Sequence, residues 1–120
     1  MTFKRIQPQE LDALTSTSNR FVVIDVRDDD YDTGGHYKGS VNIPVGDILD
    51  GRKDVMEMLD RYDLIVCYCM LSQQRGPAAA RSLCSAFPQK KIYVVTGGFT
   101  AMLEYYGPLG RIVGCPVESK

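Results

Sequence analysis

Two runs of mainly apolar residues constrain the fold more than any other feature of this 120-residue chain. They cover residues 21–26 (Phe-Val-Val-Ile-Asp-Val) and residues 64–69 (Leu-Ile-Val-Cys-Tyr-Cys). Neither run alternates strictly between apolar and polar residues, which is typical of a strand covered on both faces. Strands of this kind belong to parallel sheets, so the two runs predict a parallel sheet between layers of helices.

The rest of the chain alternates between extended and helical patterns. Strand-like patterns occupy residues 40–44 and 92–95, and helical patterns occupy residues 8–14, 48–59, 77–87 and 99–106. Residues 107–120 are interrupted by glycine and proline and predict an irregular C-terminal tail. With no repeat or linker, residues 1–120 are predicted to form a single α/β domain around a mostly parallel sheet of roughly five strands.

Charge and hydropathy exclude several classes of function. The 14 Lys and Arg residues nearly balance the 15 Asp and Glu residues, for a net charge of −1, which argues against a nucleic-acid binder. No apolar run approaches the roughly 18 residues of a membrane-spanning helix, and residues 1–10 lack the apolar region of a secretory signal. We therefore expect no nucleic-acid or membrane partner and a cytoplasmic location, with a nuclear one also open.

Four cysteines, at positions 67, 69, 84 and 115, include no Cys-x-x-Cys pair. They are too few for a disulfide framework, and the single histidine, His36, lies far from them in sequence, so a structural zinc site is not supported. Cys67 and Cys69 are two residues apart on one predicted strand and should face the same side, with Cys67 in the core. The remaining question is whether any of these thiols is reactive.

The segment from Cys69 to Pro77 carries the strongest functional signal. Cys69 ends a buried strand, Arg75 follows after five intervening residues, and a helix is predicted to begin immediately. Such a loop can close around a small site, where its N–H groups join the free donors of the helix start. These donors and the helix dipole favour a thiolate and a bound oxyanion, and a guanidinium matches two oxygens of a tetrahedral anion. The alternative, a core thiol and an unrelated surface arginine, fits this strand–loop–helix context less well.

Three motifs resemble those of the rhodanese/Cdc25 superfamily. They are Ile24-Asp25-Val26-Arg27 with Tyr31, Gly35-His36 and Asn42-Ile43-Pro44; Cys69-x5-Arg75-Gly76-Pro77; and Thr96-Gly97-Gly98-Phe99. The second is similar to the loop of Cdc25-type phosphatases. The resemblance spans about residues 5–107 and implies a rhodanese-like fold.

Loop length separates activities within the superfamily that the chain resembles. Sulfurtransferases typically place four residues between Cys and Arg, whereas phosphatases and arsenate reductases place five, as here. The resemblance implies a phosphatase that hydrolyses phosphotyrosine or an aryl phosphate through a phosphocysteine, or alternatively an Acr2-type arsenate reductase that uses glutathione and glutaredoxin. A sulfurtransferase and a non-catalytic binding module rank lower. No metal or other cofactor is expected, and the partner is a phosphorylated protein or a small phosphate or arsenate ion.

The expected site residues all lie in this loop. Cys69 is the expected nucleophile, and Arg75 is expected to hold the oxyanion. The other positions are expected to bind the oxyanion or the substrate: Met70, Leu71, Ser72, Gln73, Gln74 and Gly76.

Three positions depart from the family pattern. Tyr68 stands where the family usually has a histidine that helps to fix the loop. Met70 and Gln74 stand where Cdc25 phosphatases have acidic residues, so the loop offers no general acid. Val26 stands where Cdc25 proteins often have a protective cysteine.

Polar residues outside the loop are expected to have structural roles. Asp25 and Arg27 should pair locally, and the resemblance makes His36 part of a Gly-His turn. The aspartates at 28, 29, 30 and 32 predict a solvated acidic loop, because no calcium-binding spacing follows them.

Overall fold

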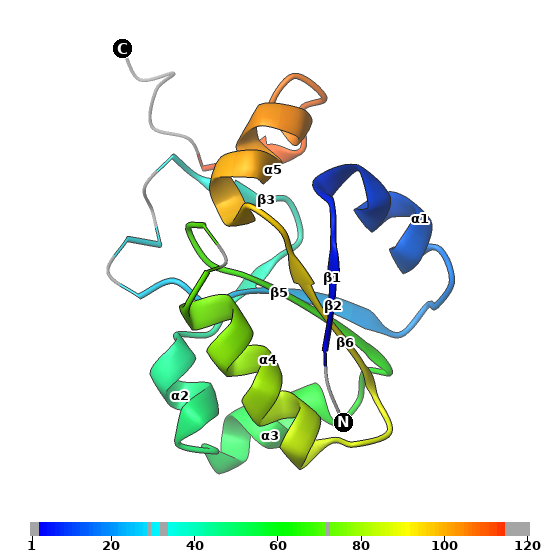
Figure 1. The fold of residues 1–120 in the computed structure, drawn as a ribbon, viewed down its shortest axis with the longest axis vertical. Helices are drawn as coiled ribbons and strands as arrows, with labels where there is room; N and C mark the ends of the chain where they lie inside the picture. Colours follow the sequence, from blue (N-terminus) through cyan, green and yellow to red (C-terminus); the bar gives the residue numbers. More distant parts are fainter. Residues whose placement is uncertain (1–2, 29, 32–33, 72, 115–120) are drawn as a thin grey trace.

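The computed structural model describes residues 3–28, 30–31, 34–71 and 73–114. Figure 1 shows a central sheet with helices on both of its faces. In chain order the elements are β1 (Lys4–Ile6), the 3-10 helix η1 (Pro8–Glu10), α1 (Leu11–Thr15), β2 (Phe21–Asp25), β3 (His36–Tyr37), β4 (Val41–Asn42), α2 (Val45–Leu49), α3 (Lys53–Leu59), β5 (Leu64–Tyr68), α4 (Arg75–Ala86), β6 (Lys91–Val95), α5 (Gly98–Tyr106) and β7 (Ile112–Val113).

The central sheet has five parallel strands in the order β1-β6-β5-β2-β4. The two apolar runs form β2 and the middle strand β5, which lie side by side with Ile24 paired to Cys67. Every residue of β5 is buried, as expected for a strand covered on both faces. The predicted α/β fold with a mostly parallel sheet is confirmed. Because the strands run parallel, the loops after β2 and β5 leave the sheet at the same edge.

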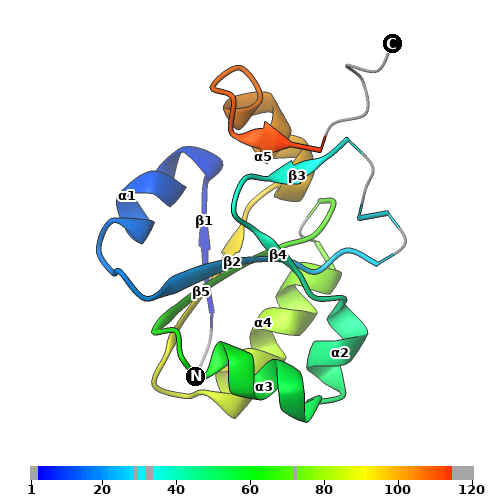
Figure 2. The same ribbon diagram turned by 180° about the vertical axis from the view of Figure 1, so that it is seen from behind.

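Two apolar cores lie on the two faces of this sheet. Ile65, Cys67 and Cys69 belong to the core that α2, α3 and α4 cover, whereas Tyr68 belongs to the core that α1 and α5 cover. Figure 2 shows α2, α3 and α4 grouped together and separated by the strands from α1 and α5. The prediction that Cys67 and Cys69 face the same side is confirmed.

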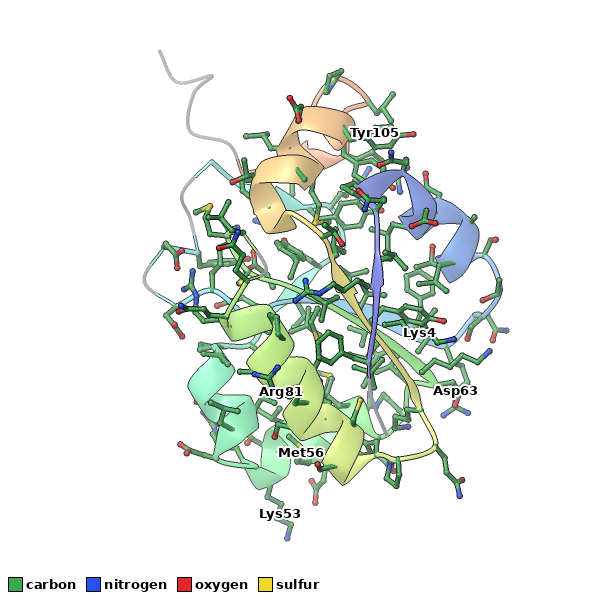
Figure 3. The ribbon with its side chains drawn as sticks, viewed as in Figure 1. Lys4, Lys53, Met56, Asp63, Arg81 and Tyr105 are labelled. Atoms are coloured by element: carbon green, nitrogen blue, oxygen red, sulfur yellow. The ribbon has the colours of Figure 1, made fainter. Side chains whose placement is uncertain are left out.

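Charged side chains lie on the outer faces of the helices. Lys53 at the start of α3 and Arg81 in α4 are both exposed (Figure 3). Within the part of the chain that the structure describes, no helix has the length and apolar character needed to span a membrane.

Residues 48–59 form parts of two helices, so the prediction of a single helix there is wrong. α2 ends at Leu49 and α3 begins at Lys53, with Gly51 between them at φ +64°. Ile48 and Leu59 both reach the same core, so the apolar pattern continues across the break and conceals it. A glycine in the left-handed region ends the first helix at low steric cost.

The segment after α5 is more regular than expected. β7 pairs antiparallel with β3, with His36 opposite Val113 and Tyr37 opposite Ile112. The prediction of an irregular tail over residues 107–120 is therefore wrong at β7, while residues 115–120, including Cys115, lie outside the described residues. A strand of two residues is too short to carry a periodic pattern, which is why the sequence does not predict it.

Candidate active site

Cys69 lies directly beyond the end of β5, where the chain turns back toward α4. Its carbonyl accepts a hydrogen bond from the Phe99 N–H at 2.8 Å, and the Met70 carbonyl accepts one from the Thr100 N–H at 3.1 Å. Phe99 and Thr100 belong to the first turn of α5, where N–H groups have no acceptor within the helix. The start of α5 therefore holds the first two residues of the loop.

Gly97 caps α5 in a conformation that other residues adopt only at a cost. Its φ is +80°, and an added Cβ would lie 2.7 Å from the Cβ of Ala101. This glycine lets α5 begin where its N–H groups reach the loop of Cys69.

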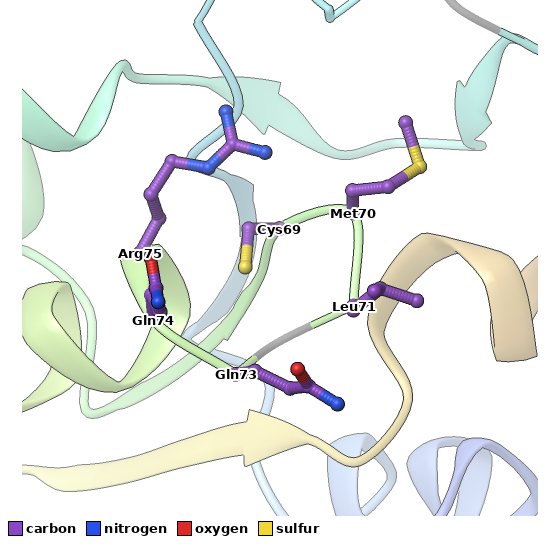
Figure 4. A pocket seen from close by; sticks show the side chains of 6 residues that line it. All are labelled: Cys69, Met70, Leu71, Gln73, Gln74 and Arg75. Atoms are coloured by element: carbon purple, nitrogen blue, oxygen red, sulfur yellow. The ribbon is translucent and has the colours of Figure 1, made fainter.

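The thiol of Cys69 points into the loop that follows it (Figure 4). Its sulfur accepts a hydrogen bond from the Gly76 N–H at 3.2 Å, and only 3% of the residue is exposed. Gly76 lies in the first turn of α4, which begins at Arg75 rather than at the predicted Pro77. Proline is tolerated in a first turn because its missing N–H has no acceptor there. The helix start therefore supplies a donor to the sulfur.

A pocket of about 160 Å³ lies within this loop. Leu71 and Gln73 on its wall are exposed, so the pocket opens to solvent. Of the other predicted site residues, Gly76 contributes its N–H group, and Ser72 lies outside the described residues. The lining consists of Cys69, Met70, Leu71, Gln73, Gln74 and Arg75.

Carboxylates from the loop after β2 hold Arg75. Its Nη1 and Nη2 donate to the two oxygens of Asp30 at 2.9 and 2.8 Å, and Nη1 also donates to Asp28 at 3.4 Å. The hydrogen bonds with Arg75 lower the pKa of Asp30 to about 2, and those with Asp30 raise the pKa of Arg75. The interpretation of this segment as a solvated acidic loop is wrong for Asp30, which is half-buried against Arg75. Asp28 is exposed, as that interpretation expects, although it also contacts Arg75. Asp29 and Asp32 lie outside the described residues. The available sequence signal was only that these aspartates follow a predicted parallel strand, because loops at the carboxyl ends of parallel strands meet at one edge of the sheet.

Asp25 and Arg27 form the predicted local pair, and both are fully buried. Arg27 donates to the Asp25 carboxylate through Nε and Nη2, and Nη2 also donates to the Gly35 carbonyl at 2.7 Å. Its guanidinium lies over the Phe99 ring, 4.2 Å from the centroid. The Asn42 amide donates to the carbonyls of Asp25 and Arg27. These contacts fix the start of the loop after β2 against α5.

The comparison with protein families agrees with this architecture. The family model of the rhodanese-like domain matches residues 7–105. The chain belongs to the rhodanese family. The predicted resemblance to the rhodanese/Cdc25 superfamily is thereby confirmed.

Curated relatives of this rhodanese-family chain include both phosphatases and a sulfurtransferase. Dual specificity phosphatase Cdc25 of Arabidopsis thaliana is 36% identical over 103 residues, covering 80% of this chain and 70% of the plant protein. Dual specificity phosphatase ibp1 of Schizosaccharomyces pombe is 30% identical over 128 residues, covering 88% of this chain and 92% of the yeast protein. Thiosulfate sulfurtransferase GlpE of Pseudomonas entomophila is 33% identical over 104 residues, covering 87% of this chain and 88% of the bacterial protein.

Two solved structures are similar to the rhodanese-family chain. One is Ygr203w of Saccharomyces cerevisiae, a homologue of single-domain rhodanese and of the Cdc25 phosphatase catalytic domain. It is 26% identical with a TM-score of 0.79, and the match covers 94% of this chain and 88% of the yeast chain. The As-Sb reductase of Leishmania major is 27% identical with a TM-score of 0.73, covering 90% of this chain and 81% of its own.

The side chain of Tyr68 in this rhodanese-family chain lies on the opposite face of the sheet from the side chain of Cys69. Its hydroxyl accepts a hydrogen bond from the Tyr37 N–H at 3.1 Å and lies 3.2 Å from the Ser40 hydroxyl. Burial, together with the charge of Asp25, raises its pKa. Tyr68 therefore ties β5 to β3 and the turn after it, and it stabilises the far end of the loop that follows β2.

Cys67 and His36 have structural surroundings. Cys67 is fully buried, and burial together with the neighbouring thiols of Cys84 and Cys69 raises its pKa to about 12, as suits the predicted core residue. His36 belongs to β3 rather than to a turn, and its ring stacks on Tyr31 with centroids 5.3 Å apart. Among the residues that the structure describes, no three His, Cys, Asp or Glu side chains gather where they could hold a metal ion.

Proposed function

We propose that this chain is a phosphatase that uses Cys69 as its nucleophile. The observation that carries the proposal is the convergence of a buried thiol, a helix-start N–H group and a guanidinium on one pocket within residues 69–76. The thiolate attacks the phosphorus of a phosphate monoester, an S–P bond forms, and the leaving oxygen departs with its bonding electron pair. Water then attacks the phosphocysteine, releasing phosphate and restoring the thiolate. Arg75 and the loop N–H groups stabilise the charge on the transferred group.

An aryl phosphate such as phosphotyrosine is the substrate that best suits this loop. A phenolate leaves with little help from an acid, because phenols have pKa values of about 10, far below those of alkyl alcohols. Met70 and Gln74 supply no proton within the loop. Met70 and Leu71 instead give the pocket apolar walls, and the 48% exposure of Leu71 leaves it open to an aromatic ring.

Hydrolysis of a chromogenic aryl phosphate tests the proposal. Cys69→Ser should abolish turnover, because a serine hydroxyl without an adjacent base is a far weaker nucleophile than a thiolate. Cys84→Ser is the matched control, since Cys84 lies in α4 and does not line the pocket. Circular dichroism should show that both variants are folded. A folded parent protein that hydrolyses no aryl phosphate, or a Cys69→Ser variant that is as active as the parent, would refute the proposal.

Arsenate reduction is the second candidate, because one pocket for a tetrahedral oxyanion suits both phosphate and arsenate and because the As-Sb reductase of Leishmania major has a similar structure. The Cys69 thiolate displaces hydroxide from arsenate and forms an S–As(V) bond. Glutathione then attacks the cysteine sulfur, so that a mixed disulfide forms and the bonding pair leaves with arsenic as arsenite. Glutaredoxin and a second glutathione restore the thiol. Arsenate-dependent oxidation of glutathione without aryl phosphate hydrolysis would favour this candidate.

Other outcomes of the same experiment are informative. Sulfur transfer from thiosulfate ranks third because the loop has five residues between Cys69 and Arg75. Inactivity of the folded protein in all three assays would favour a binding module. The expected absence of a resident cofactor and the cytoplasmic location stay predictions.

A further inference from the structure

The donors of Arg75 are divided between two edges of its guanidinium. Asp30 takes the end-on edge, formed by one hydrogen of Nη1 and one of Nη2, and Asp28 takes the second hydrogen of Nη1. No described residue accepts a hydrogen bond from Nε, and the two bonds to Asp30 leave one Nη2 hydrogen. Nε and Nη2 together form the side-on edge of the guanidinium, which no described side chain occupies.

The available edge has the chemistry that an oxyanion requires. Two parallel N–H donors on one edge of a guanidinium match two oxygens of a phosphate or arsenate. Arg75 lines the same pocket as the Cys69 thiol. An oxyanion beside that thiol and the carboxylate of Asp30 can therefore bind opposite edges of one guanidinium at the same time.

The position of Asp30 is defined by its own turn. The Tyr31 N–H donates to the Asp28 carbonyl at 3.2 Å, and the Asp28 N–H donates to Oδ1 of Asp30 at 3.2 Å. Arg27, which directly precedes Asp28, is fully buried and forms an ion pair with Asp25. The anchored turn therefore presents a carboxylate to Arg75 from outside the Cys69 loop, and residues 70–74 of that loop contain no acidic residue.

We propose that Asp30 is a positioning residue for oxyanion binding: it holds the end-on edge of the Arg75 guanidinium and so presents the Nε edge to an anion beside Cys69. The inference rests on the proposed function and assigns a role to a residue outside the loop. Asp28 assists by occupying the remaining hydrogen of Nη1.

Two competing accounts predict different results. If Asp30 only competed with the anion for Arg75, its removal would tighten anion binding. If the pair were an ordinary surface salt bridge, its removal would change little, because exposed ion pairs contribute little free energy. A positioning role predicts weaker binding, because the freed guanidinium must be ordered each time an anion binds.

Binding of inorganic phosphate, followed by two-dimensional amide NMR of the parent protein and its variants, distinguishes these accounts. Asp30→Asn should weaken phosphate binding by about tenfold, roughly the effect of losing one charge-assisted hydrogen bond that preorganises the site. The matched control is Asp54→Asn, because Asp54 pairs with Arg52 at 2.7 Å on the surface, outside the pocket. The control should bind phosphate as the parent does.

Turnover of an aryl phosphate gives a second readout. KM should rise in Asp30→Asn more than kcat falls, because the group that leaves is untouched. Tighter or unchanged phosphate binding in Asp30→Asn would overturn the inference while leaving the phosphatase proposal in place. A folded parent protein that binds no phosphate would overturn the inference, and one that also hydrolyses no aryl phosphate would overturn both.

The ion pair can also be observed without any ligand. Titration of the Asp30 side-chain carbon by NMR should give a pKa near 2 in the parent protein. An ordinary value there would show that Asp30 does not hold Arg75 in solution and would overturn the inference irrespective of activity.

Discussion

Replacing Arg27 by methionine should destabilise the whole domain, because it leaves the Asp25 carboxylate buried without its counter-ion. Both side chains are fully buried, and the side-chain hydrogen bonds between them measure 2.7 to 3.0 Å. The Gly35 carbonyl loses its 2.7 Å donor as well. Methionine preserves much of the apolar stem, so the change removes charge and hydrogen bonds more than packing.

The magnitude follows from this burial. Removing one partner of a buried ion pair costs about 3–5 kcal/mol. The total free energy of unfolding of a 120-residue domain is about 6–18 kcal/mol. We therefore expect Arg27→Met to remove a large fraction of the stability of the fold, about 4 kcal/mol.

Urea unfolding followed by circular dichroism measures this loss. With an m-value of about 2 kcal/mol/M, the midpoint should fall by roughly 2 M. The double variant Asp25→Asn/Arg27→Met should lose less than the sum of the two single variants, because no unpaired charge stays buried. Arg52→Met is the control, since its ion pair with Asp54 is exposed and should contribute little to stability. A loss as small as that of the control, or strict additivity of the two single variants, would refute the reasoning.

Tyr68→Phe removes the hydroxyl that accepts the hydrogen bond from the Tyr37 N–H. The free energy of unfolding, measured in urea, should fall by about 1–3 kcal/mol, and hydrogen exchange at the Tyr37 amide should become faster. Unchanged exchange would contradict the assigned hydrogen bond. Gly97→Ala should lower the free energy of unfolding by at least about 1–2 kcal/mol and reduce aryl phosphate turnover, because it strains the start of α5. Gly110→Ala is the control: its φ is +73° but no atom lies near its Cβ, so it should cost only the backbone strain and leave turnover unchanged. Equal turnover in both variants would count against the role of α5 in holding the Cys69 loop. Pairing with Arg75 lowers the pKa of Asp30 from 3.8 to about 2, so the stabilisation of the fold by this pair is complete above pH 3.8 and is lost as the pH falls through about 2. Asp30→Asn should therefore flatten the pH dependence of the free energy of unfolding in this range. An unaltered slope in urea unfolding would argue against the ion pair.

The sequence predicts the centre of the fold better than its edges. The run at 64–69 indicates a strand buried on both faces, and β5 is the middle strand of the sheet. β1 is an edge strand in which only Ile6 is buried, and β7 has two residues, so neither carries enough of a pattern to be predicted. The break at Gly51 is hidden because apolar residues on either side of it face one core.

The site shows the same division between local and tertiary information. The spacing from Cys69 to Arg75 predicts the loop because the strand, the loop and the helix start are consecutive in the chain. The contact between Arg75 and Asp30 depends on which strands are neighbours in the sheet, and no local pattern encodes that adjacency. The direction of Tyr68 follows from strand alternation, but its hydrogen-bond partner, Tyr37, lies in a strand too short to predict.

The pairing of β3 with β7 also has a consequence for biosynthesis. β3 cannot find its partner until residue 113 has left the ribosome, whereas β2 and the residues of the Cys69 loop emerge much earlier. Closing this stretch of chain costs more entropy than closing the shorter one between β2 and β5, which delays the contact further. We expect the nascent chain to pair β2 with β5 and to form the Cys69 loop before β3 pairs with β7.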